Sequence, residues 1–271
     1  MSKPKLSIVI PAYNEERRLS STLAAIFAYL DRQPYTFEVI VSDDGSSDRT
    51  LDIVEDSART HPELRALHNE HRGKGCTVRA GIQNATGEVV LFSDADLSTP
   101  IEELDRLLPY FDNGYEVVIG SRQGEGARRV GEPLFRHVMG RVFNYIVGLV
   151  TISGIRDTQC GFKAFSARAA AEIFRTTLLY GDNAPVIRDA MVTGFDVEVL
   201  FLAHKLGYEI REVPVRWNYD AHSKVNPIKD SWRNFRDVVN VRLNDLLGRY
   251  SIGHAGACET DSRHLAGQPV A

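Results

Sequence analysis

Two aspartates separated by one residue follow a short apolar run near the middle of the 271-residue chain. Residues 89–92 read Val-Val-Leu-Phe, the pattern of a strand buried on both faces, and Asp94 and Asp96 come soon after it. Because side chains two apart in an extended segment point the same way, both carboxylates can face one side of the strand end. Carboxylate oxygens suit a hard divalent ion that also binds a phosphate. The same spacing also occurs in turns and helix caps, for which Ser98-Thr99-Pro100 is suited.

Other polar clusters follow two earlier apolar segments. Residues 6–10 and 37–41 predict buried strands, and turn-forming polar residues follow each of them. Since ligands bind beyond the carboxyl ends of strands in such sheets, these clusters should lie near the aspartate pair. Backbone N–H groups, carboxylates and a lysine between two glycines would suit the base, ribose and diphosphate of a nucleotide, although turn chemistry alone also explains such residues. The predicted nucleotide-binding residues are Pro11, Ala12, Tyr13, Asn14, Glu15, Asp43, Asp44, Gly45, Lys74, Ser93, Asp94 and Ala95, and the predicted metal ligands are Asp94 and Asp96.

The elements that would position these clusters alternate between strand and helix. Alternation at this spacing is typical of βαβ units and a parallel sheet. We therefore expect an α/β fold with a Rossmann-like, mainly parallel sheet flanked by helices. The chain lacks both the Gly-x-Gly-x-x-Gly motif and the P-loop motif, which disfavours dinucleotide redox chemistry and P-loop hydrolysis. Strands are predicted at 6–10, 37–41, 64–67, 89–92 and 116–122, and the helices between them include about 77–84 and 101–111.

After Arg122 the pattern changes. Residues 123–133 are rich in glycine and arginine and predict a mobile loop. Residues 134–152 predict a long amphipathic helix, whose apolar side either packs in the core or lies in a membrane interface. Further helices are expected at 167–174, from 196 and at 228–250, a strand interrupted by Pro214 at 209–219, and disorder at 251–271.

Composition narrows the class of protein. The net charge of −4 argues against general nucleic-acid binding. The three cysteines are widely spaced, so we expect neither a disulfide framework nor a zinc site. The absence of a disulfide pattern is typical of proteins of the reducing cytosol. No apolar run is long enough to span a bilayer, and no signal-peptide core is present. We therefore expect a cytoplasmic protein that is either soluble or peripheral to a membrane.

The first part of the chain contains Ile8-Val-Ile-Pro-Ala-Tyr-Asn-Glu15, Val41-Ser-Asp-Asp-Gly-Ser46, Gly73-Lys-Gly75 and Ser93-Asp-Ala-Asp96. These motifs resemble those of the family 2 glycosyltransferases of GT-A fold. The second part contains Gly120-Ser-Arg122, Asp157-Thr-Gln-Cys-Gly-Phe-Lys163, Phe195-Asp-Val-Glu198, Val213-Pro-Val-Arg-Trp217 and Ser223-Lys-Val225. These motifs are similar to those of the polyprenyl-phosphate sugar synthases, especially the dolichyl-phosphate β-glucosyltransferase branch. The resemblance implies a GT-A domain at 1–250, with a nucleotide-binding half at about 5–122 and an acceptor half at about 123–250.

The resemblance implies an inverting, metal-dependent transfer of one hexose from a nucleotide sugar to a polyprenyl phosphate. Ser98 stands where the mannosyl relatives carry a glutamine, which favours UDP-glucose over GDP-mannose as the donor. Asp94 and Asp96 would hold Mg²⁺ or Mn²⁺ on the donor diphosphate. An anionic phosphate acceptor can attack without a strong base, so positioning and charge stabilisation would dominate catalysis. The implied catalytic residues are Asp96, Arg122, Lys163, Asp196, Glu198, Arg216 and Lys224, and the implied sugar or acceptor residues are Gln159, Trp217 and Ser223.

Three other functions fit parts of the sequence. A soluble family 2 transferase with a hydroxyl acceptor would use Asp196 or Glu198 as its base, although Asp196 would also suit a helix N-cap. A nucleotide-sugar-binding protein without turnover is disfavoured by the intact aspartate pair, and a nucleotidyltransferase would leave the second-half motifs unexplained. The resemblance also implies a peripheral location at the cytoplasmic face of a membrane. Docking there would come from the helix at 134–152, the Arg128-Arg129 loop or a membrane partner protein, and a homodimer is left open.

Overall fold

The structure is a computed structural model that describes residues 3–131, 133–181, 184–187, 194–219 and 227–250. Two of the predicted site residues, Ser223 and Lys224, lie outside the described residues. The predicted tail at 251–271 also lies outside them.

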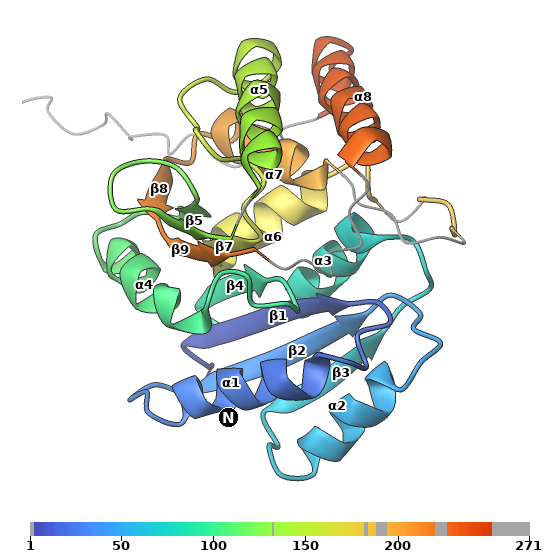
Figure 1. The fold of residues 1–271 in the computed structure, drawn as a ribbon, viewed down its shortest axis with the longest axis vertical. Helices are drawn as coiled ribbons and strands as arrows, with labels where there is room; N and C mark the ends of the chain where they lie inside the picture. The colour runs from blue at the N-terminus through green and yellow to red at the C-terminus, as the bar shows by residue number, and fades with distance from the viewer. Residues whose placement is uncertain (1–2, 132, 182–183, 188–193, 220–226, 251–271) are drawn as a thin grey trace, which may run out of the picture.

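A mixed, mostly parallel sheet of seven strands runs through the molecule (Figure 1). Its strands lie in the order β3-β2-β1-β4-β7-β5-β8. All neighbouring pairs are parallel except those that β7 makes with β4 and β5. The expected α/β fold with a mainly parallel sheet is therefore confirmed. The strands are β1 (Leu6–Ala12), β2 (Phe37–Asp43), β3 (Leu64–His68), β4 (Val89–Ser93), β5 (Val117–Ser121), β7 (Phe162–Ser166) and β8 (Ile210–Pro214).

Helices cover both faces of the sheet, and each face has its own hydrophobic core. Ile8 and Ile10 of β1 belong to one core, whereas Val9 between them belongs to the other. This alternation explains why the central strands are continuously apolar, since side chains on both faces are buried. One face is covered by α1 (Leu19–Leu30), α2 (Thr50–Ala58) and α4 (Leu104–Asp112), the last preceded by a 3₁₀ turn (Ile101–Glu103), and the other by α3 (Lys74–Gln83), α6 (Ala167–Thr176) and α7 (Phe195–Lys205).

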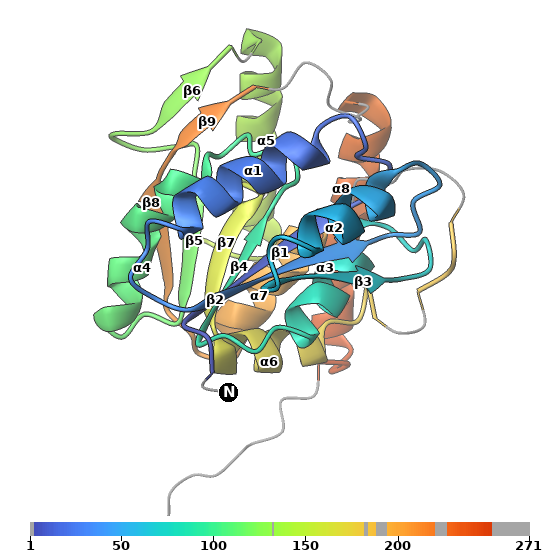
Figure 2. The same ribbon diagram turned by 90° about the horizontal axis from the view of Figure 1, so that it is seen from below.

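A second, two-stranded sheet corrects one prediction. Residues 123–133 were expected to form a mobile loop, but Arg128–Val130 form strand β6, which pairs in parallel with β9 (Arg216–Asn218). Figure 2 shows the two strands side by side, apart from the main sheet. A strand of three residues gives no periodicity to recognise, and its partner lies far along the chain. As expected, the strand-like run at 209–219 is interrupted at Pro214, where the chain leaves β8 and crosses to β9.

Two long helices lie side by side at one end of the molecule, α5 (Leu134–Val150) and α8 (Pro227–Leu246) (Figure 1). Val147 of α5 and Val238 of α8 are buried together with Val197 of α7. Other apolar side chains of both helices are exposed. α5 therefore has one packed side and one exposed apolar side.

Candidate functional site

The loops after β1 and β2 are joined by hydrogen bonds. Asn14, whose φ of 53° is in the left-handed region, donates its backbone N–H to Ser46 Oγ at 2.9 Å. In return Asn14 Oδ1 accepts from the backbone N–H of Ser47 at 2.8 Å. The Glu15 backbone N–H donates to Thr50 Oγ1 at 2.8 Å. The predicted nucleotide-binding residues of these two strands therefore lie in one rigid rim at the carboxyl end of the sheet.

The neighbouring aspartates Asp43 and Asp44 have different surroundings. Asp44 accepts from the backbone N–H groups of Arg72 and Gly73 and contacts His71 Nδ1 at 2.9 Å, so it fixes the loop that precedes Lys74. Asp43 Oδ2 accepts from the backbone N–H groups that follow it in the turn, each at 3.0 Å. The other oxygen, Asp43 Oδ1, is buried and has no hydrogen-bond partner among the described residues. A buried acceptor of this kind is suited to a donor group from a ligand.

An aromatic pair lies beside these aspartates. The rings of Tyr13 and His71 are stacked, with centroids 4.0 Å apart and planes within 4° of each other. The buried His71 Nε2 also has no hydrogen-bond partner in the part of the chain that the structure describes. Sequence reasoning overlooked His71, because a histidine in a loop gives no signal of stacking or burial.

The aspartate pair follows β4 in a turn rather than in an extended segment. β4 ends at Ser93, the Leu97 backbone N–H donates to Asp94 O at 3.2 Å, and Leu97 has a φ of 46°. The expected strand geometry is therefore wrong for Asp94 and Asp96, because the chain turns at once. The two carboxylates still interact. The pKa of Asp96 is raised mainly by burial and also by the negative charge of Asp94. Asp94 Oδ1 forms an ion pair with Lys74 Nζ at 2.6 Å.

Two carboxylates that interact in this way fit a divalent metal shared with a phosphate. No cluster of three or more His, Cys, Asp or Glu side chains that could hold a metal occurs among the described residues. The protein oxygens of Asp94 and Asp96 would thus supply part of a coordination shell, and substrate oxygens would supply the rest. Two carboxylate ligands suit Mg²⁺ or Mn²⁺, since such ions are often held by one or two carboxylates together with the phosphates of the substrate.

Gly161 is a site residue that sequence reasoning passed over. A Cβ added to Gly161 would lie 2.0 Å from Asp94 Oδ2 and 2.4 Å from Asp94 Cγ, closer than any real contact. The Asp94 backbone N–H donates to Gly161 O at 3.1 Å. The glycine belongs to the motif from Asp157 to Lys163, but only the pairing of β7 with β4 reveals why it must lack a side chain.

Arg122 lies at the end of β5 and is held by Asp157. Its Nε and Nη2 donate to the two Asp157 oxygens at 2.7 and 2.8 Å, and its backbone N–H donates to Asp157 at 2.8 Å. Burial opposes the ionisation of Asp157, but the Arg122 guanidinium outweighs this and lowers the pKa of Asp157 to about 2. The guanidinium also lies 5.3 Å from the centre of the Trp217 ring, within cation–π range.

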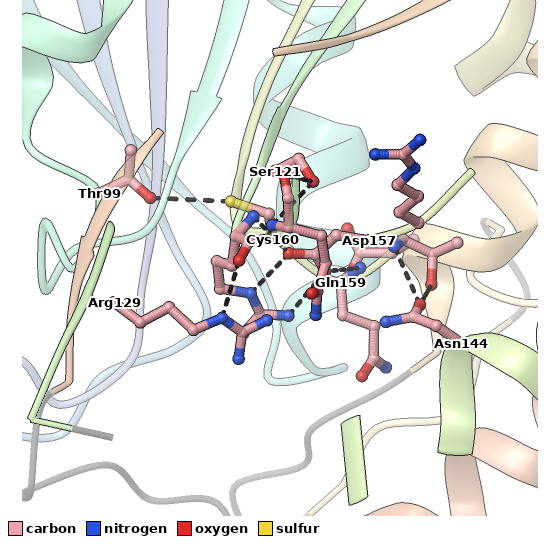
Figure 3. A network of polar contacts seen from close by, with 12 residues as sticks. Thr99, Ser121, Arg129, Asn144, Asp157, Gln159 and Cys160 are labelled. Atoms are coloured by element: carbon pink, nitrogen blue, oxygen red, sulfur yellow. Dashed lines mark hydrogen bonds and ion pairs between the residues drawn. The ribbon is translucent and has the colours of Figure 1, made fainter. Parts of the chain in front are cut away.

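A wider network surrounds this pair (Figure 3). The Gln159 backbone N–H donates to Asp157 Oδ1 at 3.3 Å, and Arg129 Nε donates to Arg122 O at 2.8 Å. Asn144 of α5 accepts at Oδ1 from the backbone N–H and the hydroxyl of Thr158, at 3.1 and 2.8 Å. The network brings together the predicted residues Arg122, Gln159 and Trp217, and it ties them to α5.

Three predicted catalytic residues are buried in internal pairs. Lys163, 1% exposed, donates to Asp196 Oδ1 and to Cys160 O, each at 2.5 Å. Burial raises the pKa of Asp196 despite this partner. Glu198 is fully buried and accepts from the backbone N–H groups of residues 178 and 179 and from the Tyr250 hydroxyl at 2.8 Å.

The buried contacts of Lys163, Asp196 and Glu198 differ from the roles predicted for these residues. In the structure, Lys163 is an internal counter-ion of Asp196 rather than a cation that faces a phosphate, and Glu198 anchors the segment that begins at Leu178. Asp196 is not the N-cap of α7, because that helix begins at Phe195 after Gly194. The sequence shows the charges of these residues but not their burial, which depends on partners far along the chain.

The remaining predicted residues lie around the same edge of the sheet. Pro11, Ala12, Ser93 and Ala95 are buried, and the Ala95 carbonyl accepts from the Thr22 hydroxyl at 2.6 Å. β9 reaches this edge because the Asn218 backbone N–H donates to Ser98 O at 2.7 Å. The other residues of this set are Gly45, which has a φ of 72°, Arg216, which is exposed on β9, and Trp217, which is half-buried.

The sequence is similar to those of known proteins. The family profile described as Glycosyl transferase family 2 matches residues 7–174. A protein named dolichyl-phosphate beta-glucosyltransferase ALG5C from Trichomonas vaginalis is 37% identical, over 91% of this chain and 73% of its own length. The dolichyl-phosphate beta-glucosyltransferase of Drosophila melanogaster is 35% identical, over 92% of this chain and 77% of its own.

Two solved structures with a similar fold identify the fold family of this chain. Glucosyl-3-phosphoglycerate synthase from Mycobacterium tuberculosis, in complex with Mn²⁺, UDP and phosphoglyceric acid, has a TM-score of 0.59 and 22% identity, covering 93% of this chain and 81% of that one. The mannosyltransferase PcManGT from Pyrobaculum calidifontis, in complex with GDP-Man and Mn²⁺, has a TM-score of 0.54 and 21% identity, covering 89% and 65%. The fold is thus the GT-A fold of glycosyltransferases. The sequence match and the shared fold together show that this chain is a glycosyltransferase that belongs to glycosyl transferase family 2.

Proposed function

We propose that the protein transfers glucose from UDP-glucose to a polyprenyl phosphate of the dolichyl type, with inversion at C1 and with Mg²⁺ or Mn²⁺ bound. The sequence relatives named dolichyl-phosphate beta-glucosyltransferase support the sugar and the acceptor. The solved structures named with UDP or GDP-Man and Mn²⁺ support the nucleotide sugar and the metal. In this proposal residues of about 5–122 bind the donor and residues of about 123–250 bind the acceptor.

One observation carries the choice of a phosphate acceptor over a hydroxyl acceptor. The two carboxylates that would serve a hydroxyl acceptor as base, Asp196 and Glu198, are both buried and engaged by internal donors. A hydroxyl group needs a base to remove its proton during attack, whereas an ionised phosphate does not. The surroundings of Asp196 and Glu198 therefore favour an acceptor that is already an anion.

The proposed mechanism assigns binding and charge stabilisation to residues of this chain. Asp43 Oδ1 would accept a hydrogen bond from the base or ribose, and Tyr13 would lie beside the base. Asp94 and Asp96 would hold the metal, which offsets the charge that develops on the departing diphosphate. Arg122 would face the acceptor phosphate from its fixed place on Asp157. Arg216 and Lys224 are proposed as further cations for the phosphates.

The transfer itself is a single displacement at the anomeric carbon. A phosphate oxygen of the acceptor forms a bond to C1 from one face, and the bond from C1 to the diphosphate oxygen breaks on the other. The nucleoside diphosphate leaves with the bonding electrons, and no proton has to be moved. Positioning of the two phosphates and stabilisation of their charge then account for the rate.

A transfer assay tests the proposal. The purified protein with Mn²⁺ or Mg²⁺ is incubated with radiolabelled UDP-glucose or GDP-mannose, with dolichyl phosphate, with undecaprenyl phosphate or without lipid, and the organic phase is counted. We expect label in the organic phase only with UDP-glucose and lipid phosphate together, and its loss in Asp96→Ala. Hydrolysis of the donor without lipid product would contradict the lipid acceptor and favour a hydroxyl acceptor.

We also propose that the protein docks on the membrane that holds its acceptor, through an apolar surface shared by α5 and α8. None of the helices in the described part of the chain combines the length and apolarity needed to cross a bilayer. Exposed arginines beside the apolar side chains would bind anionic headgroups. We therefore propose that the surface of α5 and α8 binds a lipid bilayer. The exposed apolar residues are Val138, Met139, Val142, Tyr145 and Leu149 on α5 and Trp232, Phe235, Leu243 and Leu246 on α8, and the exposed arginines are Arg141, Arg236 and Arg242.

Flotation with liposomes tests the docking surface. We expect the protein to float with vesicles that contain anionic lipid, and the double variant Leu149→Glu/Leu246→Glu to remain at the bottom of the gradient. Val186→Glu changes an exposed apolar residue outside these helices and should float like the wild type. Equal flotation of the double variant and the wild type would refute membrane binding by this surface. Self-association of the wild type without lipid would show instead that the surface binds a second copy of the protein.

A further inference from the structure

The Asp94 carboxylate is fixed on one side by the backbone of Gly161. The glycine leaves no room for the carboxylate to move toward it, since even a Cβ at Gly161 would lie 2.0 Å from Asp94 Oδ2. The hydrogen bond from the Asp94 backbone N–H to Gly161 O holds the main chain in the same place. Gly161 directly precedes β7, whose pairing with β4 keeps both backbones together. Gly161 therefore limits where the Asp94 carboxylate can lie on this side.

On its other side Asp94 meets the ammonium of Lys74, which is a movable group. Lys74 Nζ lies 2.6 Å from Asp94 Oδ1, and the lysine side chain is 32% exposed. The backbone of Lys74 is fixed, because its neighbour Gly75 is packed so tightly that a Cβ there would lie 2.6 Å from Tyr180 Cγ. Rotation about the four side-chain bonds is then the means by which the ammonium can leave Asp94.

The ammonium of Lys74 lies in the field of several carboxylates. Asp94, Asp196 and Asp96 all attract it. It also lies 5.4 Å from the centre of the Phe92 ring, within cation–π range. Asp196 has a second cation, Lys163, so the Lys74 ammonium is the one that pairs with Asp94, where a divalent ion would bind.

We propose that Lys74 occupies the place of the metal on Asp94 while the donor is absent, and that metal and donor diphosphate together displace it. The ammonium then moves from Asp94 to the diphosphate, so that one cation is exchanged for another without an unpaired carboxylate at any stage. This inference rests on the proposed function for the identity of the donor. It implies that the protein alone binds metal weakly and that the nucleotide strengthens metal binding.

Mn²⁺ binding tests the exchange without any need for turnover. The free Mn²⁺ signal in electron paramagnetic resonance is titrated for the wild type, Lys74→Met and Lys74→Arg, with and without UDP. Lys5→Met is the matched control, because it removes the same charge from an exposed pair with Glu88 at the opposite end of the strands.

We expect Lys74→Met without UDP to bind Mn²⁺ roughly tenfold tighter than the wild type or more, because a competing cation has been removed. Lys74→Arg and Lys5→Met should resemble the wild type. UDP should strengthen Mn²⁺ binding more in the wild type than in Lys74→Met. Adding Asp94→Asn to Lys74→Met should abolish the tighter binding, which places the ion at Asp94.

Each contrary result has a distinct meaning. Equal Mn²⁺ affinity of the wild type and Lys74→Met without UDP would overturn the exchange, even in an active enzyme. Tight binding that persists in the double variant with Asp94→Asn would also overturn it. Absence of Mn²⁺ binding in every variant, with UDP present, would overturn both the exchange and the proposed metal. Exchange as expected with no lipid product in the transfer assay would refute the proposed acceptor alone.

Discussion

Arg122 and Asp157 lie 35 residues apart in the sequence, yet three hydrogen bonds join them, two from the guanidinium and one from the backbone. Asp157 is fully buried, so the pair is protected from solvent on the aspartate side. This arrangement fixes the direction of the Arg122 side chain and makes its charge a permanent feature of the site.

The same pair predicts how stability depends on pH. The pKa of Asp157 falls from 3.8 to about 2 in the folded protein. Its contribution to the free energy of unfolding is therefore fully present above about pH 5 and is lost as the pH falls toward 2. A shift of this size corresponds to about 2 kcal/mol. We expect Asp157→Asn to be less stable in urea unfolding at pH 7 and to approach the wild type as the pH is lowered through 4. A constant difference at all pH values would contradict this. Glu88→Gln, in an exposed pair with Lys5, is the control and should change stability little.

Gly161→Ala is expected to disable the site without unfolding the protein. The added Cβ displaces the Asp94 carboxylate, so we expect kcat/KM for transfer to fall by about two orders of magnitude, as for the loss of one well-placed charge-stabilising group. Metal titrations should show weaker Mn²⁺ binding in the presence of UDP. Gly148→Ala in α5 is the matched control, because nothing lies within 4 Å of its added Cβ. Normal Mn²⁺ binding by Gly161→Ala would show that the carboxylate tolerates displacement.

Asp43→Asn tests the buried acceptor. The amide can still accept from the backbone N–H groups of Gly45 and Ser46 through its oxygen, while its NH₂ group takes the place of Oδ1. Loss of one acceptor for a ligand donor should weaken UDP binding by about tenfold, measured by calorimetry. The melting temperature should change little. Unchanged affinity for UDP would mean that no ligand donor meets Asp43.

Glu198→Gln separates a structural role from a catalytic one. Glu198 accepts from two backbone N–H groups and from Tyr250, and an uncharged amide makes these bonds weaker, so we expect a loss of about 1–3 kcal/mol in the free energy of unfolding. The turnover number of the folded fraction should stay within a few-fold of the wild type. A fall in turnover of a hundredfold or more, with stability preserved, would instead identify Glu198 as a base.

Much of the fold follows from local sequence patterns. The apolar runs at 6–10, 37–41 and 89–92 predict strands correctly, because both faces of the central sheet are buried. The polar residues that follow them lie together at one edge, as the geometry of parallel sheets requires. The β6–β9 pairing was missed, because three-residue strands have no recognisable period.

The parts of the site that were missed depend on contacts between distant segments. The sequence does not distinguish Asp43 from Asp44, since only the folded loop shows which carboxylate is already satisfied. It also does not show that Lys163 is buried against Asp196. Gly161 looks like any other loop glycine until the pairing of β7 places it against Asp94.

The position of β7 determines how the chain folds as a unit. β7 comes from the second part of the sequence, yet it is inserted between β4 and β5 of the first part and pairs with both. A fragment that ends at Arg122 would lack the strand that joins β5 to the rest of the sheet, and its exposed strand edges would favour aggregation. We therefore expect the proposed donor and acceptor halves to unfold together, in a single cooperative transition.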